Sequence, residues 1–321
     1  MILTKTPFRI SFAGGGSDYL LKNSNSIGNV VSVTINKFIY IIVNKKHDNK
    51  YRVSYSQTEN VNNLSNIKHE IIRNSLKFSN IKDYLEIVTM ADIPSSGSGL
   101  GSSSSLTVGL LNALYKFKKK KISSYDLAMQ SYFIESKLCN KPIGLQDQFN
   151  ASHGGLRHYI FNSNGTVLNK KILISKKRIQ DFKKNLILFY TGINRKADKI
   201  IKKINNNKNI INFKKLSDLA LEFKYELENG DLDNLGKILN ENWNIKRKLD
   251  SSVSSDEIDH LYSTALKYGA TGGKILGAGG GGYFLFFAKK EHHKILEKKL
   301  KPMQKIDFDF YNKGSELIFN D

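Results

Sequence analysis

The stretch Pro94-Ser-Ser-Gly-Ser-Gly-Leu-Gly-Ser-Ser-Ser-Ser-Leu106 lies between an apolar, β-branched segment and a run of leucines at helical spacing. It therefore predicts a glycine-serine loop that leads from a strand into the N-terminus of a helix. Free backbone N–H groups and the positive end of the helix dipole meet at such a point and favour an anion. Gly97, Gly99 and Gly101 permit positive φ angles and close approach of an oligophosphate, and Ser102–Ser105 offer caps and hydroxyl ligands. A flexible linker is the alternative, but linkers rarely join a strand to an amphipathic helix.

The composition is typical of a globular α/β protein. The chain has 321 residues, 40% of them hydrophobic, and four prolines, which suits one large domain or two ordinary ones. Its single cysteine, Cys139, cannot form an internal disulfide, and no signal peptide is evident, so we expect a cytoplasmic protein. The longest apolar runs, Phe38–Val43 and Tyr283–Ala288, are too short to cross a bilayer, so we expect no membrane partner.

The formal net charge of +21 raises the question of nucleic-acid binding. The lysines, however, are spread along the chain and mixed with asparagine and isoleucine, which indicates a general compositional bias. The one dense run, Lys116–Lys121, falls at a predicted helix end, where cations complement the dipole. No nucleic-acid-binding signature accompanies the charge, so we expect no nucleic-acid partner; the positive surplus would instead attract anionic substrates.

Hydrophobic periodicity predicts the order of the elements along the chain. Strands are predicted at 2–12, 30–34, 38–43 (with a turn near Asn36-Lys37), 51–55, 85–91, 186–190 and 304–310, and a hairpin at 154–161 and 166–174. Helices are predicted at 67–78, 103–116, 124–138, 146–151, 195–205, 213–228, 231–249, 256–268 and 291–301. Residues 272–288 read as a glycine loop followed by an apolar strand. Helix content rises after residue 180, so we predict domains at 1–180 and 181–321.

Three glycine-bearing segments recur, at residues 7–19, 94–106 and 275–283. None fits the Walker pattern, because no Gly-Lys-Ser or Gly-Lys-Thr follows the glycines. Gly277, Gly279 and Gly282 match Gly-x-Gly-x-x-Gly literally, but an apolar strand follows them. The dinucleotide fingerprint requires a helix there, so we reject it.

Two acids lie in positions suited to phosphoryl transfer, a reaction that depends on positioning and on charge stabilisation. Asp147 follows a predicted turn in Ile143-Gly-Leu-Gln-Asp-Gln-Phe149, and Glu135 lies near the end of the preceding helix. Taken alone, each acid is more often a helix cap or a salt-bridge partner than a catalytic group.

The three segments resemble, in order and spacing, the motifs of the GHMP kinases, the family of galactokinase, homoserine kinase, mevalonate kinase and phosphomevalonate kinase. Pro7-Phe-Arg-Ile-Ser-Phe-Ala-Gly-Gly-Gly-Ser-Asp-Tyr19 is similar to the first motif, Pro94–Ser105 to the nucleotide-binding motif, and Lys274-Ile-Leu-Gly-Ala-Gly-Gly-Gly-Gly282 to the third. The resemblance implies a two-domain α/β (α+β) fold. Its N-terminal domain would be ribosomal-protein-S5-like and its C-terminal domain ferredoxin-like, with the active site between them.

The resemblance also implies roles for individual residues. Asp147 would accept the proton of the attacking hydroxyl or orient that hydroxyl, and Arg9 would face the reacting centre. Ser103 and Glu135 would hold Mg²⁺, and Asp18 would accept hydrogen bonds from sugar hydroxyls. ATP would be bound by Pro94, Gly97, Ser98, Gly99, Leu100, Gly101, Ser102, Ser103 and Ser104. The substrate would be bound by Asp18, Gly15, Gly16, Ser17, Asp147, Gly279 and Gly280.

One departure from the family pattern concerns the substrate. Galactokinase-type enzymes carry Gly-Glu-His where this chain has Gly14-Gly15-Gly16, which argues against galactose. The first motif together with Thr34-Ile-Asn-Lys37 and Gln146-Asp-Gln148 is similar to the branch of D-glycero-D-manno-heptose 7-phosphate kinases, which phosphorylate the anomeric hydroxyl. We therefore expect an ATP- and Mg²⁺-dependent sugar-phosphate kinase, a monomer or homodimer, that serves nucleotide-activated heptose and surface polysaccharide. A fucokinase-like or galactokinase-like sugar 1-kinase and a non-catalytic binding protein on this scaffold stay open.

Overall fold

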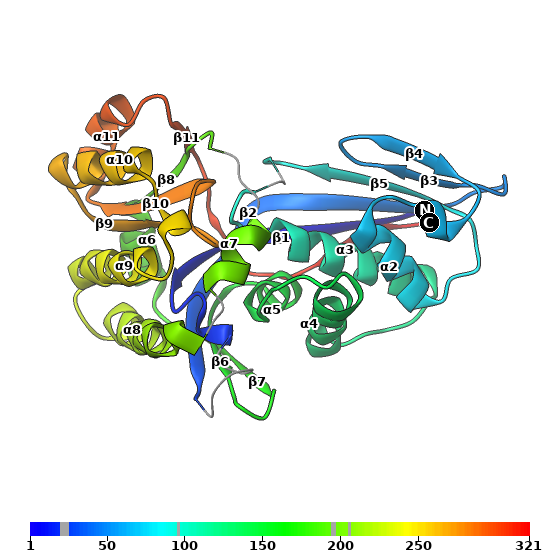
Figure 1. Ribbon diagram of the computed structural model, residues 1–321, viewed down its shortest axis with the longest axis horizontal. Coiled ribbons are helices and arrows are strands. Elements are labelled where there is room, and N and C mark those ends of the chain that lie inside the picture. Colours follow the sequence, from blue (N-terminus) through cyan, green and yellow to red (C-terminus); the bar gives the residue numbers. More distant parts are fainter. Residues whose placement is uncertain (20–25, 95–96, 194–196, 205–206) are drawn as a thin grey trace.

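The computed structural model describes residues 1–19, 26–94, 97–193, 197–204 and 207–321. Ser95 and Ser96 of the glycine-serine stretch lie outside these ranges, as do residues 195, 196 and 205 of a predicted helix. Two β-sheets, each packed against its own helices, lie side by side along the long axis of the molecule (Figure 1). The confirmed fold class is therefore a mixed helix-and-sheet architecture with two lobes.

The larger sheet fills the right half of Figure 1 and extends below the centre of the picture. Among the described residues it has nine strands, in the order β13-β1-β2-β5-β3-β4, with β12 and β6 paired to β2, and β7 paired to β6. The strands are β1 Ile2–Ala13, β2 Gly28–Lys45, β3 Tyr51–Ser54, β4 Thr58–Val61, β5 Leu85–Ala91, β6 Leu156–Phe161, β7 Val167–Lys171, β12 Phe310–Tyr311 and β13 Glu316–Asn320.

Strand β2 corrects one prediction. A turn was predicted near Asn36-Lys37 between two strands, but residues 28–45 form one strand, which pairs with β1 on both sides of that point, between Val31 and Val43. The register shifts where Pro7 pairs with Phe38 and Phe8 pairs with Ile35, so Asn36 and Lys37 form a bulge. The Asn36 N–H donates to Asp309 O at 2.9 Å, which satisfies a backbone group that the bulge removes from the ladder.

Four helices cover one face of the large sheet (Figure 1). They are α2 Glu70–Ser79, α3 Ser102–Phe117, α4 Ser124–Phe133 and α5 Gln146–His153. The predicted helix at 124–138 is continuous, but its last turn, Ile134–Leu138, is a π-helical turn. Such turns are frequent at functional sites because they rotate one side chain out of helical register; here the turn carries Glu135.

The second sheet is antiparallel, in the order β11-β8-β10-β9. Its strands are β8 Leu186–Tyr190, β9 Ala270–Ile275, β10 Tyr283–Ala288 and β11 Gln304–Ile306, and its lobe carries the helices α6 Lys176–Lys184, α7 Ala197–Ile204, α8 Ile210–Glu228, α9 Leu232–Arg247, α10 Asp256–Lys267 and α11 His293–Lys299. The sequence prediction missed β9 because Gly272 and Gly273 looked like loop. A Cβ on Gly272 would lie 1.9 Å from Gly236 O of α9, so the glycine allows helix and strand to approach closely.

The end of the chain returns to the first sheet, which the sequence did not reveal. Strand β13 pairs with β1 and β12 with β2, so both termini lie at the same end of the molecule (Figure 1). The division predicted at residue 180 falls within α6 and stays a prediction. An aromatic cluster formed by Phe12, Phe182, Phe223 and Phe310 joins the lobes, with ring centroids 5.1–6.2 Å apart.

None of the helices in the described ranges is long and apolar enough to span a membrane.

Candidate active site

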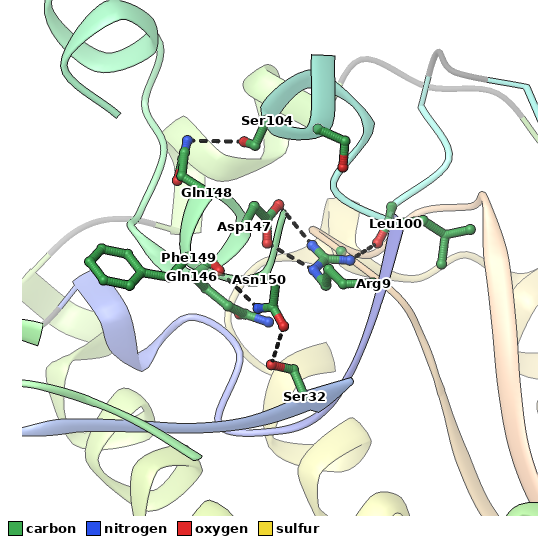
Figure 2. Close-up of polar contacts among 12 residues, drawn as sticks. Arg9, Ser32, Leu100, Ser104, Gln146, Asp147, Gln148, Phe149 and Asn150 are labelled. Carbon is green, nitrogen blue, oxygen red and sulfur yellow. Dashed lines mark hydrogen bonds and ion pairs between the residues drawn. The ribbon is translucent and has the colours of Figure 1, made fainter. Parts of the chain in front are cut away.

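Arg9 and Asp147 face each other at the junction of the two lobes (Figure 2). Arg9 Nε and the Nη2 atom each donate to one Asp147 oxygen at 2.8 Å, which makes the ion pair bidentate. Arg9 lies on β1 and its side chain is 6% exposed, whereas Asp147 is in the first turn of α5 and 29% exposed. The arginine is thus fixed by the protein, and the carboxylate keeps one side open toward a ligand.

Buried amide contacts hold α5 in place. Asn150 Nδ2 donates to Gln146 O at 2.8 Å, and Ser32 Oγ donates to Asn150 Oδ1 at 2.8 Å, which ties the helix to β2 (Figure 2). Because the Ser32 hydroxyl and the Asn150 amide are buried and hydrogen-bonded to each other, the large sheet determines the position of α5 and thus of Asp147.

The glycine-serine loop has the predicted conformation. Gly97, Gly99 and Gly101 all have positive φ, between 67° and 78°, so this part of the prediction is confirmed. Arg9 is bound to the loop twice, because its backbone N–H donates to Leu100 O at 3.0 Å and its guanidinium to Gly99 O. The loop then enters α3 at Ser102, which brings a helix N-terminus next to the Arg9–Asp147 pair.

The predicted nucleotide residues differ in exposure. Ser98 and Ser104 are buried, whereas Pro94 is exposed at the entrance of the loop. Leu100 is fully buried in the core, so only its backbone faces the site. Ser104 Oγ accepts a hydrogen bond from Gln148 Nε2 at 2.9 Å, and Ser98 Oγ contacts Ser102 Oγ at 3.3 Å.

The third glycine segment packs directly on this loop. A Cβ on Gly277 would lie 2.5 Å from the Gly99 Cα, and one on Gly282 would lie 2.6 Å from Ser98 O. The segment therefore supports the loop from the second lobe, and its glycines are required by close backbone contact. Gly279 and Gly280, predicted to bind substrate, lie against Val253 instead of lining the pocket, whose residues on this side include Gly277 and Ala278.

Asp18 is buried beside Asp147. Its Oδ2 atom accepts a hydrogen bond from the Gln146 N–H at 3.2 Å, and burial followed by the charge of Asp147 raises the pKa of Asp18 to about 6. Gly15 and Gly16, which the resemblance assigns to the substrate, line the same pocket. Ser17 is fully buried and donates to Asn29 O at 2.8 Å, so its role here is to hold the turn that carries Asp18.

Ser103 and Glu135, the predicted metal ligands, are in direct contact. Ser103 Oγ donates to Glu135 Oε2 at 2.6 Å, and Gln148 Nε2 donates to Glu135 Oε1 at 2.9 Å. Glu135 is fully buried; burial raises its pKa, while Lys141 and these hydrogen bonds oppose the rise. Within the described ranges no three His, Cys, Asp or Glu side chains gather around one point. A hydroxyl and one carboxylate nevertheless fit Mg²⁺, which binds through one or two carboxylates and substrate phosphates.

The pocket between the lobes is lined by three basic and two acidic side chains. Arg9, Lys246 and Lys274 line it against the two carboxylates of Asp18 and Asp147. Lys274 is fully buried and donates to Phe12 O at 3.0 Å; burial, and then the charges of Lys246 and Arg9, lower its pKa well below the ordinary value. Basic side chains in this lining could contact an anionic group of a ligand.

Several residues of the site were not predicted from the sequence. Lys141 Nζ donates to Ser103 Oγ at 2.9 Å. Ser11 and Gln146 line the pocket, and Ser11 Oγ and Gln146 Nε2 are buried without a hydrogen-bond partner among the described residues. The sequence could have indicated Ser11, because it lies two residues after Arg9 and therefore on the same face of the strand. Lys141 had no such signal, because it lies near Ser103 only through the chain turn that follows the π-helical turn.

Together, a glycine loop at a helix N-terminus, an arginine-bound aspartate and a hydroxyl-carboxylate pair define a phosphoryl-transfer site. The comparisons with known proteins agree with this class. The chain matches the GHMP kinases N terminal domain over residues 66–155 and the GHMP kinases C terminal domain over residues 223–301. It is 30% identical to the D-glycero-alpha-D-manno-heptose 7-phosphate kinase of Campylobacter jejuni, with 98% of this chain and 97% of that protein aligned.

Solved structures show the same fold. A putative sugar kinase from Campylobacter jejuni has 28% identity and a TM-score of 0.78, covering 98% of this chain and 97% of that one. A D-glycero-D-manno-heptose 1-phosphate kinase from Bacteroides thetaiotaomicron has 22% identity and a TM-score of 0.82, covering 100% of both chains. The chain belongs to the GHMP kinase family. Its relatives place it among the sugar kinases of that family, as the motifs indicated.

Proposed function

We propose that this enzyme transfers the γ-phosphoryl group of ATP to the anomeric hydroxyl of a sugar phosphate. The observation that carries the proposal is the Asp18 carboxylate, buried next to the Asp147–Arg9 pair in a single pocket. A carboxylate accepts hydrogen bonds from two neighbouring hydroxyls, so Asp18 would hold a diol while Asp147 contacts the hydroxyl that reacts. Ser11 Oγ and Gln146 Nε2 would bind further hydroxyls of a polyhydroxylated substrate.

The substrate that we propose is D-glycero-D-manno-heptose 7-phosphate, and the product is the 1,7-bisphosphate. The relative with 30% identity over nearly the whole chain is a kinase of that substrate class. Lys246 and Lys274 also line the pocket, where a phosphate already present on the substrate could contact them. The product would then supply nucleotide-activated heptose for surface polysaccharide. We propose that the enzyme works in the cytoplasm as a monomer or homodimer.

Asp147 and Arg9 would act on the attacking hydroxyl. Each Asp147 oxygen accepts one hydrogen bond from Arg9 and keeps another lone pair. The sugar hydroxyl would donate to Asp147 and lose its proton to that carboxylate as its oxygen bonds to the γ-phosphorus. The bond from phosphorus to the bridging oxygen breaks, and ADP leaves with that oxygen. Arg9 would keep Asp147 oriented and place positive charge beside the transferring group.

The nucleotide would be held by the loop and by the start of α3. The left-handed glycines and Ser102–Ser104 would bring backbone N–H groups and hydroxyls to the phosphates. Ser103 and Glu135 would hold Mg²⁺, which when bound neutralises charge on the phosphate oxygens. Gln148 donates to both Ser104 and Glu135, so it would fix the position of the metal-binding carboxylate relative to the loop.

A coupled assay of ADP release tests this function. D-glycero-D-manno-heptose 7-phosphate, galactose, fucose, mevalonate and homoserine are each supplied with ATP and Mg²⁺. We expect turnover with the heptose phosphate and phosphate at C1 of the product. Turnover of a free sugar alone would indicate a fucokinase-like or galactokinase-like enzyme. Turnover of mevalonate or homoserine alone would refute the role of Asp18.

A further inference from the structure

Lys141 contacts the phosphate loop from outside the known motifs. Asn140, in the left-handed conformation with φ of 49°, turns the chain after the π-helical turn, and the Lys141 N–H donates to Glu135 O at 3.0 Å. The backbone of Lys141 is thereby tied to the residue predicted to bind the metal. Its ammonium reaches Ser103 Oγ at 2.9 Å, and Ser103 in turn donates to Glu135 Oε2.

The environment of this ammonium is unusual for a lysine. Ser103 is the second residue of α3, so Lys141 Nζ lies at the positive end of a 16-residue helix, where a cation is unfavourable. The buried carboxylate of Glu135 offsets part of this repulsion, because it is hydrogen-bonded to the same Ser103 hydroxyl that accepts from Lys141. A lysine ammonium has three donors, and a phosphate bound by the N–H groups of α3 would lie within reach of this flexible side chain.

We propose that Lys141 is a phosphate-binding residue of the active site: its ammonium neutralises Glu135 while the site is empty and binds the terminal phosphates of ATP when the nucleotide enters. This inference rests on the proposed use of ATP. It gives the loop between the π-helical turn and α5 a part in nucleotide binding, because Lys141 brings a positive charge to the start of α3.

Binding of ATP without metal tests the proposal directly. Isothermal titration in the presence of EDTA compares the wild type with Lys141→Met, Lys141→Arg and the control Lys137→Met, an exposed lysine on the π-helical turn. We expect Lys141→Met to weaken ATP binding by about 10- to 100-fold, the usual range for a lost hydrogen bond to a charged group. Binding of AMP should be unchanged, Lys141→Arg should recover part of the affinity, and Lys137→Met should match the wild type.

A different result would overturn the inference. If Lys141→Met binds ATP as tightly as the wild type, or binds Mg²⁺ more tightly without loss of ATP affinity, the lysine only neutralises Glu135. Circular dichroism checks that each variant is folded. The proposed function is tested by a separate measurement. A wild type that binds ATP but phosphorylates no sugar phosphate would refute that function, while the effect of Lys141→Met on ATP binding could still be interpreted. A wild type that does not bind ATP would refute both.

Discussion

Replacing Asp18 by asparagine should stabilise the protein at neutral pH while weakening its affinity for substrate. Burial raises the pKa of Asp18 from an ordinary value of 3.8 to about 6. This difference corresponds to about 3 kcal/mol, since each pKa unit is worth about 1.4 kcal/mol. Asparagine is uncharged and has the same shape, and its carbonyl oxygen can still accept the Gln146 N–H, so the variant avoids the cost of a buried charge without losing that contact.

The direction of the Asp18 pKa shift determines how the stability difference between the variant and the wild type depends on pH. Because the folded pKa lies above the unfolded one, the Asp18 carboxyl favours folding below about pH 4, and this contribution is lost as pH rises through 6. The free energy of unfolding of Asp18→Asn should therefore nearly equal that of the wild type at pH 4. The difference in favour of the variant should rise between pH 4 and 6 and level off above pH 7 at no more than about 3 kcal/mol. For a chain of this length that limit is about 4 °C in Tm.

Thermal and urea unfolding of both proteins between pH 4 and 8 measure this difference. Asp307→Asn is a matched control, because the Asp307 side chain is 93% exposed; we expect it to follow the wild type throughout. In the kinase assay, the KM of Asp18→Asn for the sugar phosphate should rise about 10- to 100-fold, with the KM for ATP unchanged. A variant less stable than wild type at pH 8, or a stability difference that does not vary with pH, would refute the assignment of a buried charged carboxylate.

Three further substitutions test the site. Asp147→Asn should lower kcat by about 10²- to 10⁴-fold, the usual contribution of a general base, while ATP binding by titration is retained; unchanged turnover would contradict the catalytic role. Gly144→Ala places a Cβ 1.9 Å from Asp18 Oδ2, so the carboxylate must move. The KM for the sugar phosphate should then rise at least about 10-fold. An unaltered KM would show that Asp18 does not bind the sugar. Ser103→Ala removes the hydroxyl next to Glu135. In a metal titration, the Mg²⁺ concentration for half-maximal activity should therefore increase several-fold. An unchanged Mg²⁺ concentration would exclude Ser103 as a metal ligand.

The part of the site that the sequence predicted depends on local chemistry. Positive φ at Gly97, Gly99 and Gly101 follows from a glycine loop between a strand and a helix, and the structure confirms it. The proximity of Arg9 and Asp147 came from the resemblance to the family, since 138 positions separate them in the chain. No periodicity or spacing rule brings two such distant residues together.

The predictions that failed depend on contacts between distant segments. Asn36-Lys37 has the composition of a turn, but pairing of β2 with β1 on both sides of it leaves only a bulge. Gly272 resembles a loop residue, but close packing of α9 on β9 requires it within a strand. Strands β12 and β13 have only two and five residues, too few to show a clear period, and they pair with strands at the other end of the chain, β12 with β2 and β13 with β1.

The residues that would bind ligands are also those with unfavourable environments among the protein's own groups. The Asp18 and Glu135 carboxyls have raised pKa values through burial, and the Lys274 ammonium has a lowered one for the same reason. Buried Ser11 Oγ and Gln146 Nε2 find no hydrogen-bond partner in the described part of the chain. Each of these groups would gain a partner from a phosphate, a metal ion or a sugar hydroxyl, so a site of this kind gives up stability to favour its substrates. The large sheet and the aromatic cluster between the lobes supply the rigidity that keeps such groups in place.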